Sequence, residues 1–275
     1  MILSSDNFIF QQRQVLEYHD TALCIDLHCH CLTGIDDGPA DCLASQNLCA
    51  ALISEGFDVV VVTLHPLGRY DGCIDALGIR QRVRDLNEWL TQNHWLLVVL
   101  PGAENRGDER VLELLRQDHL MTIADEKQVF SLELPFDMFI DIRPLLARLA
   151  DNGIRAIIAH PERNRELSIR PQRVLEWVEY NPVLQITASS LLGRFGNVVQ
   201  KAGYALMELL LLAVVATDAH NTDQRGPCFK EAFDWIARFI GHDRTRQLFI
   251  ENAQGLIQNL AFVEEGLNKE RMDPI

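Results

Sequence analysis

Residues 59-VVVVTLH-65 form a run of four valines that continues through threonine and leucine to a histidine. Valine is β-branched, and β-branched residues favour extended strands. A strand that is apolar on both faces fits a parallel sheet covered on both sides, whereas strands of open antiparallel sheets alternate apolar and polar residues. The run therefore predicts a buried parallel strand that ends in a polar group.

The same theme recurs along the chain, because six other short apolar runs alternate with stretches that have helical spacing. Alternating strands and helices predict βαβ units and a parallel sheet. Seven such units without a linker rich in proline, glycine or serine fit one barrel better than two domains. The predicted strands are 25–30, 59–65, 96–104, 129–134, 154–160, 183–189 and 211–220.

The two ends of the chain differ from the barrel region. We predict an N-terminal arm at 1–22, an α/β barrel domain at 23–262 and a polar C-terminal tail at 263–275. The segment 243–260 is predicted to be a C-terminal helix. Residues 1–22 lack the apolar core of a signal peptide, and no run of 18 apolar residues occurs, so no membrane span is predicted.

The charge balance argues against two broad classes of partner. Aspartate and glutamate number 39 and lysine and arginine number 25, which gives a formal net charge of −14. A general binder of nucleic acid or of anionic membranes would carry a basic face instead. We therefore expect no nucleic-acid partner, and an anionic substrate would need metal ions or a few placed arginines.

Seven cysteines, an odd number, indicate a cytoplasmic protein with reduced thiols rather than a disulfide framework. Cys29 and Cys31 alternate with the histidines of the first strand and so point to its opposite face. Cys42 and Cys49 fall in the first helix. No C-x2-C pair occurs, and no arginine follows a cysteine at the spacing of cysteine-based phosphatases. We therefore expect the cysteines to act as small buried apolar residues.

Polar residues gather at the carboxyl ends of the predicted strands. In a parallel barrel these ends converge on one mouth, where active sites lie. Histidines and carboxylates are costly to bury without partners, and cations would supply the partners. Nitrogen and oxygen donors without cysteine suit Zn, Mn or Fe. The residues concerned are His28, His30, His65, Glu104, Glu133, His160, Asp218 and His220.

Spacing within the strands supports one shared site. Residues i and i+2 of a strand point the same way, so His28 and His30 share a face, as do Asp218 and His220. Each residue alone has an ordinary structural explanation; His65, for example, could cap the helix that follows it. Independent explanations would not place all of these side chains at corresponding strand ends.

With these residues identified, the chain resembles the PHP (polymerase and histidinol phosphatase) superfamily. Within it, the chain is similar to the bacterial manganese-dependent protein-tyrosine phosphatases of the CpsB/YwqE type, which are encoded with capsule and exopolysaccharide genes. The usual SDAHN of the subfamily reads TDAHN here, and the loop 68-GRYDG-72 is altered. The matching stretches are 26-DLHCHCLTGIDDGP-39, 63-TLHP-66, 102-GAE-104, 132-LELP-135, 158-IAHPERNRE-166, 187-TASSLLGRFG-196 and 217-TDAHN-221.

The resemblance implies a distorted (β/α)7 TIM-like barrel in one domain and a site for three divalent metal ions. Manganese is expected, with iron or zinc as alternatives. By matching motifs, the first ion would be held by His28, His30, Glu104 and Asp218. Glu104 would bridge to a second ion held also by Glu133 and His160, and a third would be held by Asp37, His65 and His220. Asp36 is then a neighbour that supports the ligands.

The resemblance also implies phosphate-binding arginines. Arg163 and Arg225 match the family's pair and are expected to act in catalysis together with Asp37, while Arg194 is a weaker candidate. Another explanation of Arg163 and Arg165 is that they form surface ion pairs with neighbouring glutamates.

The function that the resemblance implies is hydrolysis of phosphotyrosine by a metal-activated hydroxide. The expected partner is a tyrosine-phosphorylated protein, such as a tyrosine kinase of polysaccharide synthesis. Alternatives are a PHP phosphoesterase that acts on a small phosphomonoester such as histidinol phosphate, and an inactive metal-binding subunit that docks on a kinase. Both a monomer and a homo-oligomer are compatible with the sequence.

Overall fold

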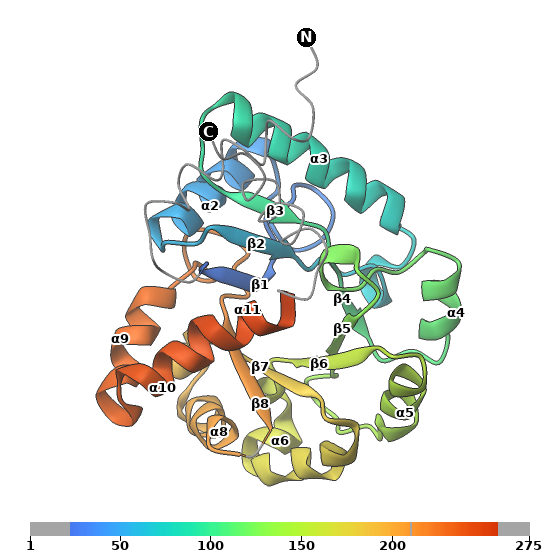
Figure 1. Ribbon diagram of the computed structural model, residues 1–275, viewed down its shortest axis with the longest axis vertical. Helices are drawn as coiled ribbons and strands as arrows, with labels where there is room; N and C mark the ends of the chain where they lie inside the picture. The colour runs from blue at the N-terminus through green and yellow to red at the C-terminus, as the bar shows by residue number, and fades with distance from the viewer. Residues whose placement is uncertain (1–22, 210, 258–275) are drawn as a thin grey trace, which may run out of the picture.

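The strands of the computed structural model lie side by side in a barrel, with helices around its outside (Figure 1). The structure describes residues 23–209 and 211–257, so the predicted arm at 1–22 and tail at 263–275 lie outside the described residues. The strands are β1 Ile25–Cys29, β2 Val59–Val62, β3 Val98–Leu100, β4 Glu104–Arg106, β5 Val129–Glu133, β6 Arg155–Ala159, β7 Val183–Thr187 and β8 Leu212–Ala216.

All strand pairs are parallel, as the four valines of β2 predict. The strands form two sheets, of order β1-β2-β3 and β4-β5-β6-β7-β8. Isolated bridges join the sheets at Leu64 with Ala103 and at Cys29 with Ala219. At the second seam the N–H of His30 donates to the carbonyl of Ala219 at 2.9 Å. The two sheets therefore close into one barrel at the carboxyl ends of their strands.

The predicted third strand, 96–104, is divided into β3 and β4. Pro101 has no N–H to donate to a neighbouring strand. A Cβ at Gly102 would lie 2.7 Å from the Val62 carbonyl oxygen, so only glycine permits this close approach to β2. β3 pairs with β2 and β4 pairs with β5. Together they occupy one position in the barrel, which explains eight strands where seven were predicted.

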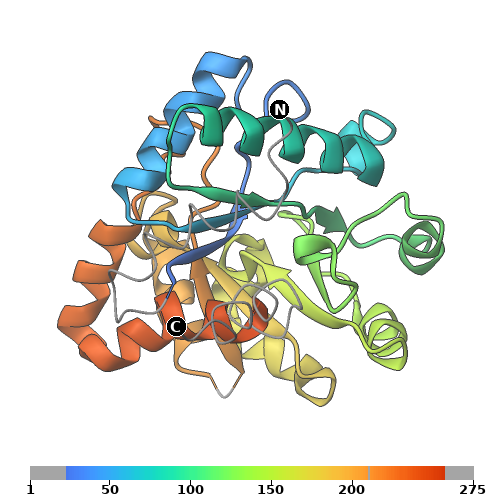
Figure 2. The ribbon, with the colours of Figure 1, turned by 45° about the horizontal axis from the view of Figure 1, so that its top comes forward.

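Helices cover the outer face of the strands, and α2 and α3 lie together outside the β1-β2-β3 sheet (Figure 2). The α-helices are α2 Cys42–Ser54, α3 Ala76–Gln92, α4 Val111–Arg116, α5 Arg143–Asp151, α6 Arg165–Ile169, α7 Ala188–Leu191, α8 Asn197–Met207, α9 Phe229–Ile240, α10 His242–Arg246 and α11 Asn252–Ile257. Tighter 3-10 turns are η1 Gly68–Tyr70, η2 Ile123–Asp125, η3 Pro161–Arg163 and η4 Pro171–Tyr180. The predicted helix at 243–260 is α10, a π-turn (η5 Gln247–Glu251) and α11 as far as residue 257.

Two apolar clusters form the core. The larger one lies between strands and helices and includes Val60 of β2 and Leu48 of α2. The smaller one fills the barrel near the strand starts, where Ile25 and Val59 meet Leu256 of α11. Helix α11 therefore closes the amino-terminal end of the barrel, opposite the mouth.

Strand β1 is irregular just before the site. Leu27 belongs to the interior cluster, whereas Cys29 belongs to the outer one. The pairing of β1 with β2 shifts register between Asp26 and Cys29. Irregularities of this kind re-aim side chains beside functional sites. Leu27 can therefore pack inside the barrel while its neighbour His28 points into the mouth.

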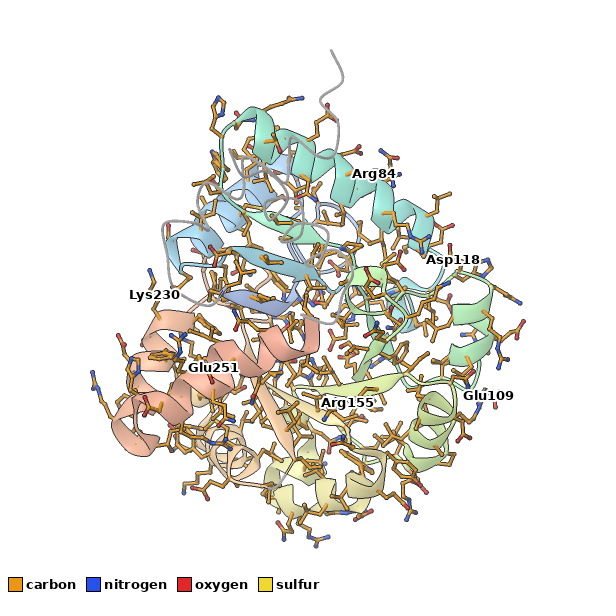
Figure 3. The ribbon with its side chains drawn as sticks, in the orientation of Figure 1. Arg84, Glu109, Asp118, Arg155, Lys230 and Glu251 are labelled. Carbon is orange, nitrogen blue, oxygen red and sulfur yellow. The ribbon has the colours of Figure 1, made fainter. Side chains whose placement is uncertain are left out.

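Charged side chains project outward from the covering helices, as Arg84 of α3 and Lys230 of α9 do (Figure 3). None of the helices formed by residues 23–209 and 211–257 is long and apolar enough to cross a membrane.

Candidate metal centre

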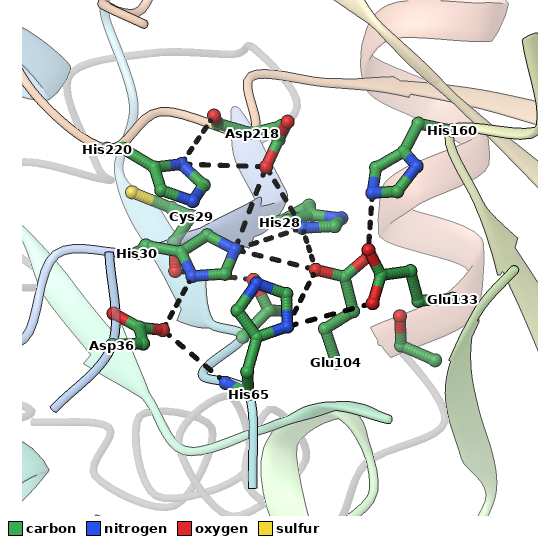
Figure 4. A network of polar contacts seen from close by, with 12 residues as sticks. His28, Cys29, His30, Asp36, His65, Glu104, Glu133, His160, Asp218 and His220 are labelled. Atoms are coloured by element: carbon green, nitrogen blue, oxygen red, sulfur yellow. Dashed lines mark hydrogen bonds and ion pairs between the residues drawn. The ribbon is translucent and has the colours of Figure 1, made fainter. Parts of the chain in front are cut away.

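The predicted histidines and carboxylates come together at the carboxyl ends of the strands (Figure 4). His28 lies within β1, Glu133 ends β5, and His160 directly follows β6. Asp37 reaches the cluster from the loop that follows β1. The structure brings together the whole predicted set, which is His28, His30, Asp37, His65, Glu104, Glu133, His160, Asp218 and His220.

Glu104, the first residue of β4, lies at the centre of the cluster. Its Oε2 is 3.1 Å from Nε2 of His28 and 3.6 Å from Nε2 of His30. Its Oε1 is 2.7 Å from Nε2 of His160. One carboxylate therefore faces histidines near the end of β1 with one oxygen and the histidine after β6 with the other.

Asp218 occupies the opposite side of the β1 histidines. Its Oδ1 is 3.3 Å from Nε2 of His28 and 3.6 Å from Nε2 of His30. Asp218 has φ 52°, and His160 has φ 30°. These left-handed conformations are uncommon for residues other than glycine and concentrate at functional sites. Both side chains reach the mouth from backbone turns directly after their strands.

A second set of polar groups fixes the ring orientation of three histidines. Nδ1 of His28 is 2.8 Å from Oε1 of Gln185, and Nδ1 of His30 is 2.8 Å from Oδ2 of Asp36. Nδ1 of His220 is 3.0 Å from the backbone oxygen of Asp218. Metal-binding histidines characteristically donate their other ring N–H in this way. In all three, Nε2 is left to face the cluster.

The donor atoms are spaced as ligands of shared cations would be. Ligands about 2.0–2.2 Å from one ion, at tetrahedral or octahedral angles, lie about 3–3.6 Å apart. The separations around Glu104 and Asp218 match this spacing, and Nε2 of His220 is a buried atom without a hydrogen-bond partner. Four overlapping sets could each hold an ion: His30, Asp37, His65 and His220; His28, His30 and Glu104; His28, His160 and Asp218; and Glu104, Glu133 and His160.

Buried charges of like sign lie close together in this cluster. Burial raises the pKa of Glu133 to about 7, and the neighbouring charge of Glu104 adds to this rise. Burial would also raise the pKa of Glu104, but His28 and His160 outweigh it and hold that pKa well below its usual range. Bound divalent cations would compensate the negative charge of this carboxylate pair.

The histidines of the cluster differ in protonation. Burial lowers the pKa of His160 to about 4, and it lowers the pKa of His220 to about 4 as well. For His30, Asp36 outweighs burial and raises the pKa to about 9. Burial therefore favours the neutral, metal-binding form of His160 and His220, whereas a metal would have to displace a proton from His30.

Both expected arginines lie at the cluster. The side chain of Arg163 is largely buried, and its Nη2 donates to Asp218 and, at 3.3 Å, to Thr187 Oγ1. Arg225 donates from Nη1 to Asp37 at 3.0 Å and from Nη2 to Asp218 at 3.1 Å. The Nε atoms of both arginines are buried without a hydrogen-bond partner. Each guanidinium thus keeps a free donor, and the ion-pair explanation with neighbouring glutamates is wrong for Arg163.

A cavity of about 380 Å³ opens over the cluster. Its lining combines site residues with the apolar side chains of Phe136, Phe195 and Val199. Arg194 does not line it, because its guanidinium pairs with Glu231 of α9 at 2.8 Å. The weaker arginine candidate is therefore directed away from the site.

The cysteines keep apart from the cluster. Cys29, Cys31 and Cys49 are buried in the outer apolar cluster, as predicted. The expectation of burial is wrong for Cys42 and Cys73, which are exposed. Burial raises the pKa of Cys29 to about 11, so its thiol is not a nucleophile at neutral pH.

A parallel barrel whose mouth gathers five histidines, four carboxylates and two arginines around a small cavity has the donor set of a divalent-metal site. The chain belongs to the CpsB/CapC family of capsular polysaccharide synthesis proteins, whose model matches residues 24–258. This match confirms the family resemblance and covers nearly all of the described residues.

Characterised relatives align over most of their length. The chain is 33% identical to the tyrosine-protein phosphatase YwqE of Bacillus subtilis over 237 residues, 86% of this chain and 92% of that protein. It is 31% identical to the tyrosine-protein phosphatase CpsB of Streptococcus agalactiae over 245 residues, 86% of this chain and 98% of that protein.

A solved structure of the family shares the fold. A structure from work on YwqE of Bacillus subtilis and CpsB of Streptococcus pneumoniae, described as unique metal-dependent tyrosine phosphatases, superposes with a TM-score of 0.80. The match has 33% identity and covers 86% of this chain and 94% of that chain. The predicted single-domain α/β barrel is thereby confirmed.

Proposed function

We propose that this protein is a metal-dependent protein-tyrosine phosphatase. The observation that carries the proposal is the meeting of nine donor side chains with two arginines, each with a free Nε, beside a cavity that five of the donors and both arginines line. Its relatives YwqE and CpsB are tyrosine-protein phosphatases, and this chain covers more than nine-tenths of each.

We assign three divalent ions to the cluster, with manganese as the expected metal and iron or zinc as alternatives. His28, His30, Glu104 and Asp218 would hold the first. The placement of Glu104, with its two oxygens toward different histidines, supports a bridging role to a second ion held by Glu133 and His160. The third would be held by Asp37, His65 and His220; Oδ1 of Asp37 lies 3.7 Å from Nε2 of His65 and 3.4 Å from Nε2 of His220.

Bound cations would lower the pKa of a water so that a hydroxide is available near neutral pH, and they would neutralise phosphoryl oxygens. Arg163 and Arg225 would bind the remaining oxygens of the phosphoryl group through their free N–H groups. Asp218 holds both guanidinium groups, and Asp37 also holds that of Arg225. The arginines are therefore oriented before the substrate arrives, which reduces the reorganisation that catalysis requires.

None of the cysteines in the described residues lines the cavity, and Cys29, next to His28, points into the outer core. The Asp36 carboxylate is not free to act as a nucleophile either, because it accepts from the Gly38 N–H and pairs with His30. The phosphoryl group would therefore pass directly to the attacking hydroxide, without an enzyme-bound intermediate.

We further infer that the substrate is a tyrosine-phosphorylated protein in the cytoplasm, such as a tyrosine kinase that controls capsule or exopolysaccharide synthesis. The family's role in capsular polysaccharide synthesis supports this inference.

Metal removal tests the proposed function. Treatment with a chelator should abolish hydrolysis of p-nitrophenyl phosphate and of a phosphotyrosine peptide, and manganese should restore both activities. Cys29→Ser serves as the matched control and should retain turnover, whereas His28→Ala should lose it while the protein remains folded. Full activity after complete metal stripping, or loss of activity in the cysteine variant alone, would refute the metal mechanism.

A second candidate is a phosphoesterase for small phosphomonoesters, which the small cavity of about 380 Å³ would also admit. Comparison of kcat/KM for a phosphotyrosine peptide and for histidinol phosphate separates the two. A preference for histidinol phosphate would favour the second candidate. A metal-loaded protein that turns over neither compound would instead fit an inactive kinase-docking subunit.

A further inference from the structure

Two phenylalanines stand half-exposed at the entrance of the cavity. Phe136 is 47% and Phe195 38% exposed, and both line the cavity. Exposed Met138 and Val198 neighbour them in sequence. Apolar side chains grouped at the rim of a polar site commonly mark a ligand-binding surface, whereas isolated ones need no explanation.

Both rings lie against groups that face the reaction site. The guanidinium carbon of Arg163 is 5.9 Å from the centroid of the Phe136 ring and 4.9 Å from that of Phe195. The Phe136 ring also stacks on His160, at 5.8 Å between centroids and 15° between planes. If the phosphoryl group of a phosphate ester binds at Arg163, the organic group of that ester would therefore lie close to both rings.

The loop that carries Phe136 is fixed from a segment beside the site. Asn164 donates from Nδ2 to the carbonyl oxygens of Pro135 at 2.6 Å and Met138 at 2.9 Å. The N–H of Arg165 donates to the carbonyl of Phe136 at 2.8 Å. These bonds hold the loop against the segment 160–165, which carries Arg163. Because the loop is ordered in advance, binding of a ring would cost little conformational entropy.

Phe195 is placed by a tight turn between α7 and α8. Gly193 has φ 77° and Gly196 has φ 91°, values that favour glycine on both sides of the ring. The N–H of Arg194 donates to the carbonyl of Ser189 at 3.0 Å. The turn thus presents Phe195 to the cavity while directing Arg194 toward Glu231.

We propose that Phe136 and Phe195 form an aromatic slot that binds the ring of an aryl phosphate and makes the site select aryl over alkyl phosphomonoesters. This inference rests on the proposed phosphatase function and names the residues that determine its substrate class. Offset or edge-on contact between aromatic rings is favourable beyond the burial of their area. The cavity, about 380 Å³, is near the small end for ligand sites and suits one ring with its phosphate.

Hydrolysis rates alone would not test the slot, because phenolate is intrinsically a better leaving group than an alkoxide. Binding of inert analogues avoids this difficulty. Phenylphosphonate and methylphosphonate carry the same anionic group and differ in the ring. Their dissociation constants would be measured by calorimetry on the manganese-loaded full-length protein and on variants that carry Phe136→Leu, Phe195→Leu or both substitutions (the double variant). Inorganic phosphate is the ligand common to all.

We expect the wild type to bind phenylphosphonate at least about fivefold more tightly than methylphosphonate, and the double leucine variant to lose this preference. Binding of inorganic phosphate should change by less than about twofold, because the arginines and metal ligands remain. Phe195→Tyr should retain the preference. Phe239→Leu, which removes a 65% exposed ring of α9 that does not line the cavity, is the matched control and should bind like the wild type.

The outcomes separate the slot from the proposed function. Equal affinity for the two phosphonates in an active wild-type phosphatase, or an undiminished preference in a folded double variant, would overturn the slot and leave the function standing. A ring preference that depends on both phenylalanines in a protein without phosphatase activity would support the slot and overturn the function. Thermal unfolding of each variant establishes that it is folded.

Discussion

Thr217 donates its hydroxyl hydrogen to Oδ2 of Asp26 across 2.5 Å, joining the last strand of the barrel to the first. The N–H of Thr217 donates to the other oxygen of Asp26 at 3.0 Å. Both groups are buried, and burial raises the pKa of Asp26 to about 6. Asp26 lies two residues before His28, and Thr217 lies one residue before Asp218. The hydrogen bonds between them therefore fix the relative position of candidate ligands that are far apart in the chain.

Replacement of Thr217 by valine should destabilise the protein by about 2 kcal/mol, because a buried carboxylate and the N–H of Ala219 lose a partner. The loss should be larger at pH 8 than at pH 5, since Asp26 is ionised above its pKa of about 6 and then needs the donor most. Urea unfolding of the metal-free protein at both pH values measures the effect.

Two controls belong to this experiment. Thr217→Ser keeps the hydroxyl and should lose less than about 1 kcal/mol, the cost expected for one methyl group. Thr91→Val removes a hydroxyl that donates to the Asn87 carbonyl within α3, and it should have a small effect at either pH. A serine variant as unstable as the valine variant would show that the methyl group, not the hydrogen bond, stabilises the seam.

Gln185 should act as a positioning residue for His28. Its Oε1 is the partner of His28 Nδ1 and accepts from the N–H of His160 at 3.2 Å. Loss of such a supporting group typically weakens metal binding about 10- to 100-fold. Gln185→Ala is therefore expected to raise the manganese dissociation constant by this factor, measured by calorimetry.

Gln185→Glu retains an acceptor for the imidazole N–H and should recover much of the affinity lost in the alanine variant. Gln200→Ala, whose side chain donates to the Leu191 carbonyl away from the cavity, is the matched control. Unchanged manganese affinity in a folded Gln185→Ala protein would contradict the positioning role.

Catalysis should require the planar guanidinium groups of Arg163 and Arg225 and not only their positive charge. Lysine at Arg163 or Arg225 keeps one positive charge but cannot offer two parallel N–H donors. Each substitution is expected to lower kcat/KM for p-nitrophenyl phosphate by about 100-fold or more. Arg194→Lys should stay within about twofold of the wild type, because that guanidinium pairs with Glu231 outside the cavity. Wild-type turnover in Arg163→Lys would remove this residue from the proposed mechanism.

Manganese affinity should rise with pH between about 6.5 and 9. Asp36 raises the pKa of His30 to about 9 against the effect of burial, so below that pH a metal must displace a proton from this ring. Glu133, whose pKa burial raises to about 7, must also lose its proton in this range. Against burial, Glu104 and Asp218 raise the pKa of His28 well above its usual value, which adds to the dependence. His160 and His220, with pKa values of about 4, are already neutral and add none. Calorimetry in buffers of different ionisation enthalpy would count the protons released; pH-independent binding without proton release contradicts the expectation.

Much of the fold follows from short apolar runs in the sequence. The run 59–62 is β2, and the predicted strands at 129–134 and 183–189 contain β5 and β7. Two features escaped prediction because they depend on tertiary contact. The division of 96–104 reflects the approach of Gly102 to β2, and the irregularity of β1 breaks the strict alternation on which face assignments rest.

The candidate ligands were predictable because their chemistry is expensive to bury and their positions recur at strand ends. Gln185 was missed, since an amide in the apolar run 183-VLQIT-187 resembles neither a ligand nor an ion-pair partner. A lone amide in a fully buried strand was nevertheless a signal that it needs a specific partner. The opposite orientations of Arg194 and Phe195 could not be read from their motif, because the turn at Gly193 and Gly196 decides them.

The closure of the barrel also has a consequence for biosynthesis. Asp26 and Thr217 are separated by 191 positions, and Asp218, His220 and Arg225 follow the seam. A growing chain that has emerged from the ribosome only as far as α8 already contains His28, His30, Glu104 and His160 but has neither the seam nor the last ligands. Segments this far apart in the chain lose conformational entropy when they meet, before their contacts stabilise the fold. All nine candidate ligands can therefore come together only after nearly the whole domain has been synthesised.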